Sequence, residues 1–260
     1  MARSARMTRI LILGGTAEAR ALAAALAGRK DLAVTLSLAG RTADPLKQPV
    51  AVRSGGFGGA EGLAAYLRAE GIDLLIDATH PYAAAISANA AEAARVAQVK
   101  LIALRRPPWR KATGDLWTEV DTMEDAVKAL GDAPRRVFLA LGRKELRPFE
   151  AAPQHVYLVR SVDPVDPPLS VPYAIYRTAR GPFSEDEDRA LLERHRIDVI
   201  VAKNSGGEAT YGKITAARTL HLPVIMLKRP ALPEVEGAAT IEDALRAIDH
   251  AITFSTARGV

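Results

Sequence analysis

The sequence predicts an α/β protein built from two tandem Rossmann-like halves, each a doubly wound parallel sheet, with a cleft between them. Three observations carry this prediction. A continuous apolar run at 9–13 leads through a glycine pair into an alanine- and leucine-rich helix at 17–26, strand-like and helix-like segments then alternate, and the same segments recur later in the chain. Because parallel strands need crossover helices, this alternation favours right-handed βαβ units.

The repeat rests on four matched segments that occur in the same order in both halves. They are 72–78 with 197–203, 99–107 with 222–230, 124–130 with 242–248 and, faintly, 9–14 with 136–142. Shared apolar composition alone does not produce four matches in one order. The turn-forming stretch at 131–134 then predicts one domain over 1–131 and a second over 132–260.

The elements follow from apolar runs and their periodicity. The first half predicts strands near 9–13, 33–38, 50–53, 73–77 and 100–104, with a short one near 116–120. The second half predicts strands near 136–141, 155–160, 173–177, 198–202 and 223–227. The acidic run 184–188 is typical of the first turn of a helix, where negative charge is stabilised by the helix dipole.

Composition excludes several function classes. The 260 residues are 48% hydrophobic and contain no cysteine, which excludes disulfides, thiolate metal sites and a cysteine nucleophile. No apolar run reaches the roughly 18–20 residues that span a bilayer, and no signal-peptide core precedes the first strand, so we expect a soluble cytoplasmic protein without membrane contact. The net charge of +5 comes with local basic clusters but no nucleic-acid-binding motif, and we expect no nucleic-acid partner.

The turn after the first strand predicts an anion site. Gly14, Gly15 and Thr16 lie between a buried strand and a helix N-terminus, where backbone N–H groups and the helix dipole favour a phosphate. The dinucleotide fingerprint is incomplete, because Thr16 and Ala19 stand where glycine is usual.

The end of the second strand predicts which dinucleotide binds. Gly40, Arg41 and Thr42 stand where an Asp or Glu would hold the ribose hydroxyls of NAD, whereas an Arg suits the additional 2′-phosphate of NADP. Arg41 is permanently charged and can bind a phosphate bidentately, with Thr42 as a further donor. The alternative is that Arg41 is a solvated loop residue.

Two further loops in the first half fall at strand ends. The glycine-rich loop at 54–59, which includes Gly56, suits a backbone that passes close to a cofactor, or is a plain flexible loop. Thr79 and His80 are candidates for the nicotinamide, its ribose or its phosphates, and His80 and Tyr82 for proton donation. A lone histidine is also often structural, and Asp77 could cap the next helix or hold His80.

The counterpart loop of the second half is rich in hydrogen-bond donors. It predicts a substrate or cofactor site, whereas a helix N-cap at Ser205 or Thr210 would explain only one residue. Its candidate binding residues are Lys203, Asn204, Ser205, Gly206, Gly207 and Lys213. No histidine and carboxylate spacing suited to a metal is present, and we expect no metal.

Together these motifs resemble the precorrin-6A reductase family of cobalamin biosynthesis over essentially the full length. The motifs that carry the resemblance are GGTAEAR, the GGFGG loop, DATHPYA, the Arg-Arg-Pro-Pro-Trp segment and KNSGG, in this order. The resemblance implies NADPH-dependent reduction of one double bond of precorrin-6A to give precorrin-6B, or of the cobalt complex in organisms that insert cobalt early. Neighbouring enzymes of that pathway are candidate partners.

The resemblance also implies a polycarboxylate tetrapyrrole substrate, which would explain the basic residues. We expect Arg143, Lys144, Lys203 and Lys213 to anchor its acetate and propionate groups. The turn at 141–145 has lost one glycine and gained two cations relative to the turn at Gly14, so the nucleotide is expected in the first half. His80, Tyr82, Lys203 and bound water are the candidate proton donors.

Two other functions remain as alternatives. Another NADP-dependent reductase or epimerase would need a Tyr-x-x-x-Lys pair, and Tyr211 and Lys213 have the wrong spacing. A non-enzymatic NADP redox sensor would predict few donors in the second half, where the residues from 203 to 213 are rich in them.

Overall fold

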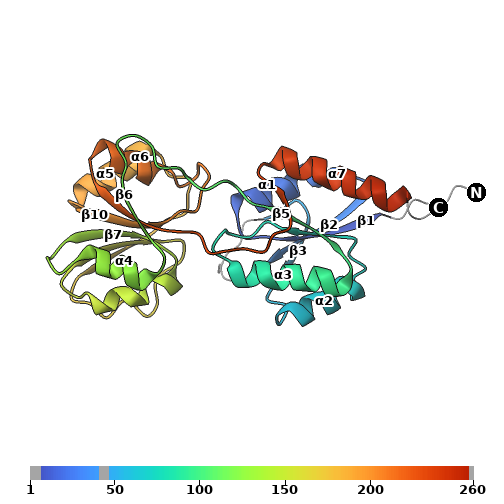
Figure 1. Cartoon of the computed structure of the whole chain (residues 1–260), viewed down its shortest axis with the longest axis horizontal. Coiled ribbons are helices and arrows are strands. Elements are labelled where there is room, and N and C mark those ends of the chain that lie inside the picture. Colours follow the sequence, from blue (N-terminus) through green and yellow to red (C-terminus); the bar gives the residue numbers. More distant parts are fainter. Residues whose placement is uncertain (1–6, 41–46, 258–260) are drawn as a thin grey trace, which may run out of the picture. The chain divides into compact units, whose positions relative to one another are not determined.

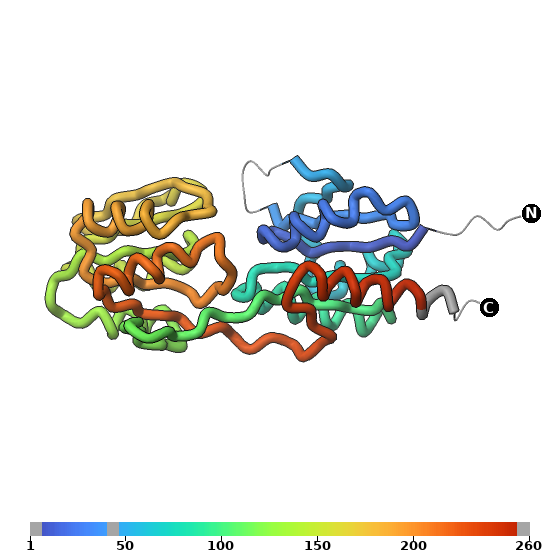
Figure 2. The backbone as a smooth tube through the Cα atoms, turned by 90° about the horizontal axis from the view of Figure 1, so that it is seen from above, coloured from blue at the N-terminus to red at the C-terminus, as the bar shows by residue number. Residues whose placement is uncertain are grey.

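The computed structural model describes residues 7–40 and 47–257 and forms two compact units. Unit 1 comprises Met1–Arg106 and Pro230–Val260, and unit 2 comprises Pro107–Arg229. The chain therefore crosses between the units twice, after Arg106 and after Arg229 (Figure 2). No helix among the described residues is long and apolar enough to cross a membrane.

Unit 1 is a six-stranded parallel sheet in the order β12-β5-β4-β1-β2-β3, the strand order of a Rossmann fold. Its strands are β1 (Thr8–Leu13), β2 (Leu32–Leu38), β3 (Ala51–Ser54), β4 (Leu74–Asp77), β5 (Lys100–Leu104) and β12 (Glu236–Ala238). Helices α1 (Ala17–Leu26) and α7 (Ile241–Ala257) cover one face, and α2 (Ala60–Ala69) and α3 (Ala84–Ala97) cover the other (Figure 1).

Alternation along β1 explains why both faces are covered. Ile10 and Ile12 belong to the core shared with α1 and α7, whereas Leu11 and Leu13 belong to the core shared with α2 and α3. All four are buried. A strand with apolar residues on both faces must lie inside a doubly covered parallel sheet, which is what its continuous apolar run predicts.

Unit 2 repeats this plan in the order β6-β11-β10-β7-β8-β9. Its strands are β6 (Leu116–Val120), β7 (Arg136–Ala140), β8 (Val156–Ser161), β9 (Ala174–Thr178), β10 (Val199–Lys203) and β11 (Pro223–Leu227). Its helices are α4 (Met123–Leu130), α5 (Glu185–Arg194) and α6 (Gly212–Thr219), with the 3-10 turns η1 (Arg143–Glu145) and η2 (Arg147–Ala151) between β7 and β8.

The internal repeat predicted from the sequence appears in the structure as the same pair of hydrogen bonds, between an arginine and an aspartate, at the start of each central strand. In unit 1 the backbone N–H of Arg9 donates to Asp73 Oδ2 over 2.9 Å. In unit 2 the backbone N–H of Arg136 donates to Asp198 Oδ2 over 2.7 Å. In both units the aspartate N–H returns a hydrogen bond to the arginine carbonyl, so each pair fixes the register of two neighbouring strands.

The division between the units differs from the predicted boundary at 131/132. Strand β6 pairs with β11 and strand β12 pairs with β5, so each copy contributes its last strand and helix to the sheet of the other copy. An exchange of this kind leaves the order of elements along the chain unchanged, and order is all that the sequence pattern reports. The eleven predicted strands are present, and β12, with the sequence Glu-Gly-Ala, is the one that apolar periodicity missed.

Candidate functional site

The turn after β1 is held by Thr16. Its Oγ1 accepts a hydrogen bond from the Ala19 N–H over 3.0 Å and donates to the Ala78 carbonyl at the end of β4 over 2.8 Å. Thr16 is thus the N-cap of α1, which explains why threonine replaces the glycine of the usual fingerprint. Gly15 has a φ of +117°, a conformation that favours glycine.

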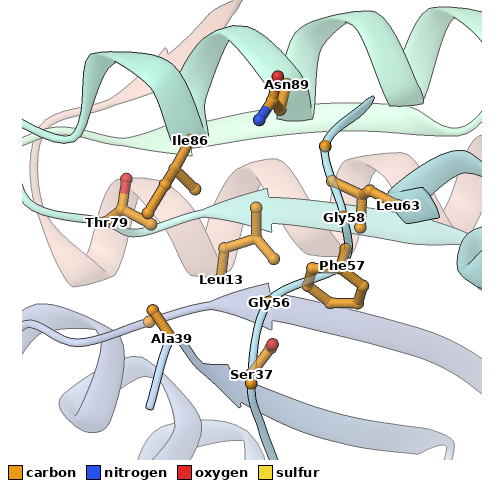
Figure 3. Close-up of a pocket in the computed structure, with 13 residues that line it drawn as sticks. Leu13, Ser37, Ala39, Gly56, Phe57, Gly58, Leu63, Thr79, Ile86 and Asn89 are labelled. Atoms are coloured by element: carbon orange, nitrogen blue, oxygen red, sulfur yellow. The ribbon is translucent and has the colours of Figure 1, made fainter. Parts of the chain in front are cut away.

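A pocket of about 270 Å³ opens beside this turn at the carboxyl edge of the unit 1 sheet. This edge is where ligands bind in open parallel sheets. Figure 3 shows the lining side chains, which come from the ends of β1, β2 and β4, the loop after β3, and helices α2 and α3. The predicted residues that line it are Gly14, Gly56 and Thr79.

The glycine-rich loop after β3 is held by Arg53. The Arg53 guanidinium donates to the carbonyls of Gly55 and Gly56 and lies 3.7 Å from the centre of the Phe57 ring. On the far side of the loop, a Cβ at Gly62 would lie 1.7 Å from the Phe57 carbonyl oxygen, so α2 begins in direct contact with the loop. These contacts present the loop backbone and the Phe57 ring to the pocket.

Asp77, at the end of β4, is buried and organises the next loop. Its Oδ1 accepts from the N–H of Thr79 at 3.1 Å and from the Thr79 hydroxyl at 2.6 Å, and its Oδ2 accepts from the Ser87 hydroxyl on α3 at 2.6 Å. The Arg105 guanidinium lies 3.7 Å from the same carboxylate and compensates its buried charge. Asp77 therefore positions Thr79 and fixes α3.

His80 and Tyr82 lie in the loop that Asp77 organises. The backbone N–H of Tyr82 donates to His80 Nδ1 over 3.3 Å, and the two rings lie 5.7 Å apart. That contact assigns the proton of a neutral His80 imidazole to Nε2, because Nδ1 serves as the acceptor.

An ion pair lies next to the first turn of α1. Glu18 Oε2 and Arg106 Nη1 are 2.5 Å apart, and both side chains are largely covered. A carboxylate in the first turn would repel a phosphate at the same helix end, and Arg106 neutralises it. Gly40 approaches the backbone of Gly55 from the end of β2, whereas Arg41 and Thr42 lie outside the described residues.

In unit 2, the loop after β10, at 204–207, binds the segment through which the chain enters the unit, at 107–109. Asn204 is buried, and its side chain pairs with both backbone groups of Trp109: Oδ1 accepts from the N–H over 2.7 Å and Nδ2 donates to the carbonyl over 2.9 Å. The Trp109 indole N–H donates to the Gly207 carbonyl over 2.8 Å. The paired glycines allow this approach, because a Cβ at Gly206 would lie 2.1 Å from the Pro107 carbonyl oxygen.

The segment that leaves unit 2 is held by the same loop. Arg229, the last residue of the unit, donates to the carbonyls of Asn204 and Ser205 and to that of Pro107. The hydrogen bond from Arg229 Nη2 to the Pro107 carbonyl thus joins the two connecting segments, whose course Figure 2 shows. Neither Ser205 nor Thr210 is the N-cap of α6, which begins after Tyr211 without a side-chain cap.

The predicted cations of unit 2 lie in different surroundings. Lys203 Nζ pairs with Glu145 Oε1 over 2.9 Å, and Arg143 and Lys144 are exposed on η1. Lys213 is 4% exposed, donates to the Thr210 carbonyl and lies 4.7 Å from the centre of the Trp109 ring. Its ammonium group therefore lies against the Trp109 ring.

Sequence reasoning missed Arg53, Glu18 and Asn89 as part of the unit 1 site. Arg53 immediately precedes the glycine-rich loop, which is the one signal that could have indicated it. Glu18 and Asn89 lie on helices whose orientation the sequence alone does not report.

The chain is similar to known proteins over nearly its whole length. The model of the family described as precorrin-6x reductase CbiJ/CobK matches residues 9–249. The chain is 58% identical over 242 residues to the precorrin-6A reductase of Sinorhizobium sp, covering 93% of each chain. It is 50% identical over 255 residues to that of Rhodobacter capsulatus, covering 98% of this chain and 100% of the relative. The solved structure of CobK precorrin-6A reductase is 48% identical, has a TM-score of 0.90 and covers 94% of this chain and 97% of that one.

Proposed function

The chain belongs to the precorrin-6x reductase family, and from that premise we propose that it reduces one double bond of the precorrin-6A macrocycle with NADPH, giving precorrin-6B. The observation that carries the nucleotide part is the pocket beside the turn at Gly14 and Gly15, at the carboxyl edge of a sheet with Rossmann order. The first-turn N–H groups of Ala17 and Glu18 have no acceptor within the helix, as suits a pyrophosphate.

NADPH rather than NADH is proposed on the residues that follow β2. Gly40, Arg41 and Thr42 would surround the ribose, with Arg41 pairing with the 2′-phosphate. Arg41→Ala should therefore raise the KM for NADPH far more than the KM for NADH. Equal effects on both cofactors would remove Arg41 from the 2′-phosphate site.

When bound, the nicotinamide would supply a hydride, and the residues of this chain would set the positions of the two reactants. The reaction would add this hydride and one proton across one conjugated double bond, so that NADPH and H⁺ would be consumed and NADP⁺ released. His80 would line the nicotinamide end of the site, and Thr79, which lines the pocket beside it, would contact the nucleotide there. His80, Tyr82 and Lys203 are proposed as candidate proton donors, alongside water.

The carboxylates of the macrocycle are proposed to bind unit 2. Arg143 and Lys144 are exposed, and Arg143 and Lys203 can take carboxylates by exchanging their partners Asp163 and Glu145. Lys213 would add positive potential from its buried place beside Trp109. Ser205, Gly206 and Gly207 are proposed to complete this surface with hydroxyl and backbone donors, and Asn204, whose side chain holds the Trp109 backbone, to keep their loop in place.

Anaerobic incubation with precorrin-6A and NADPH tests the reaction. The absorbance of NADPH and of the tetrapyrrole should change together, with one equivalent of each consumed. NADPH oxidation that is independent of the tetrapyrrole, or no oxidation, would overturn the proposal. A parallel reaction with cobalt-precorrin-6A reports whether the metal-free or the cobalt-containing macrocycle is the better substrate.

A further inference from the structure

The lining of the unit 1 pocket includes one side-chain amide. Asn89 lies on α3 and lines the pocket (Figure 3). The other two polar side chains that line it are engaged, because Ser37 accepts from Arg53 and Thr79 donates to Asp77. Among residues 7–40 and 47–257, the Asn89 amide has no hydrogen-bond partner.

The walls around this amide are apolar. Leu13, Phe57, Leu63 and Ile86 line the same pocket, and the Phe57 ring is held in place by the Arg53 guanidinium on it. A pocket with apolar walls and one polar group that fixes orientation is the usual design for a flat heteroaromatic ligand. A side-chain amide offers an acceptor and a donor side by side, so its complement is a ring edge that carries a donor next to an acceptor.

The course of a dinucleotide along the sheet edge indicates which end enters this pocket. The pyrophosphate belongs at the turn after β1, and the ribose of the adenosine half belongs at the end of β2. The loop after β3 comes next along the edge, and its Gly55–Gly59 backbone and Phe57 ring form the pocket wall. The base attached to that ribose is therefore the group that reaches Asn89.

We infer that Asn89 reads the edge of the adenine ring of the cofactor, with Oδ1 accepting from the 6-amino group and Nδ2 donating to the adjacent ring nitrogen. This pairing is the one by which asparagine recognises adenine elsewhere. The inference rests on the proposed function, because it takes the nucleotide as the ligand of this pocket. It makes Asn89 a specificity-determining residue for the base.

Fragments of the cofactor test the inference in the full-length protein. Calorimetry measures the Kd of 2′,5′-ADP, 5′-AMP and reduced nicotinamide mononucleotide for the wild type, Asn89→Ala and the control Glu92→Gln, which is exposed on the same helix. Asn89→Ala should weaken both adenine-containing fragments about tenfold, as expected for the loss of paired hydrogen bonds, and leave the mononucleotide unchanged. Glu92→Gln should change none of them.

A base without the 6-amino group completes a double-mutant cycle. The purine analogue of 2′,5′-ADP, with hydrogen at position 6, should bind the wild type about fivefold more weakly than 2′,5′-ADP and should bind Asn89→Ala as well as 2′,5′-ADP does. Equal discrimination by the two proteins would overturn the role of Asn89, as would a loss confined to the mononucleotide. Failure of the proposed function is distinguishable, because then the wild type itself would bind neither NADPH nor its adenine fragments, and circular dichroism reports whether each variant is folded.

Discussion

Asn204→Ala is the substitution that best separates holding the entering segment from binding substrate directly. In the structure the Asn204 side chain uses both its oxygen and its nitrogen on the backbone of Trp109. Removing it leaves one N–H and one carbonyl of the half-buried Trp109 without these partners. The prediction is that unit 2 loses stability and that Trp109 becomes mobile.

The magnitude follows from the two hydrogen bonds. Each contributes about 1 kcal/mol net, and incomplete rehydration of the Trp109 backbone adds to the loss, so we expect about 2–3 kcal/mol in the free energy of unfolding. That corresponds to roughly a 30- to 150-fold change in the unfolding equilibrium constant, or a shift of about 1 M in the urea midpoint.

Tryptophan fluorescence is the natural assay, because both tryptophans of the chain, Trp109 and Trp117, belong to unit 2. Urea unfolding followed at the emission maximum therefore reports this unit. Gln154→Ala is the matched control: it removes an exposed amide that makes two long contacts, 3.3 Å to the Gly131 carbonyl and 3.4 Å to His155 Nε2, and it should cost under about 0.5 kcal/mol. An Asn204→Ala protein with wild-type stability and wild-type emission would refute the reasoning and leave Asn204 as a direct substrate ligand.

Three further predictions concern the site and its support. Gly62→Ala should push the Phe57 carbonyl away and weaken NADPH binding at least tenfold, as measured by calorimetry. Gly56→Ala, where a Cβ meets nothing within 4 Å, should leave the fold intact, as measured by circular dichroism. Equal melting temperatures for the two variants would contradict the close contact between Gly62 and the Phe57 carbonyl. Arg106→Ala should raise the Kd for NADPH about tenfold by leaving Glu18 unneutralised, and Glu18→Gln in the same protein should restore most of the affinity; no restoration would place the effect elsewhere. Burial lowers the pKa of His155 below its ordinary value of 6.5, so the folded state resists protonation of this side chain. The free energy of unfolding should therefore fall as the pH drops below about 6.5. Urea titrations at each pH should show a shallower fall for His155→Asn than for the wild type.

Several features of the site could be predicted from sequence because they are local. The glycine pair after β1, the histidine loop after β4 and the donor-rich loop after β10 each follow a buried strand, and parallel strands end at one edge of a sheet. Thr16 departs from the fingerprint for an equally local reason, since it caps the helix that begins at the next residue.

Other features depend on side-chain directions that no local pattern reports. Asn89 lies in the middle of a helix and faces the pocket only because α3 packs against α2 beside the glycine-rich loop. The ion pair of Glu18 with Arg106 joins residues 88 positions apart, and the pair of Asn204 with Trp109 joins residues 95 positions apart. Such pairs depend on tertiary packing, which periodicity does not contain.

By itself the sequence determined the α/β class, the strands that form the two sheets, the internal duplication and the family. Buried strands, glycine turns and repeats can be recognised from residue type and spacing alone. Only the tertiary structure decided how the copies share their elements. The last strand and helix of each copy complete the sheet of the other, and the loop that reads as a binding motif also grips both connecting segments. The physical reason is that a β-strand can pair with any sheet edge that has the right register and apolar faces, and that choice is made by packing in three dimensions rather than by the local pattern.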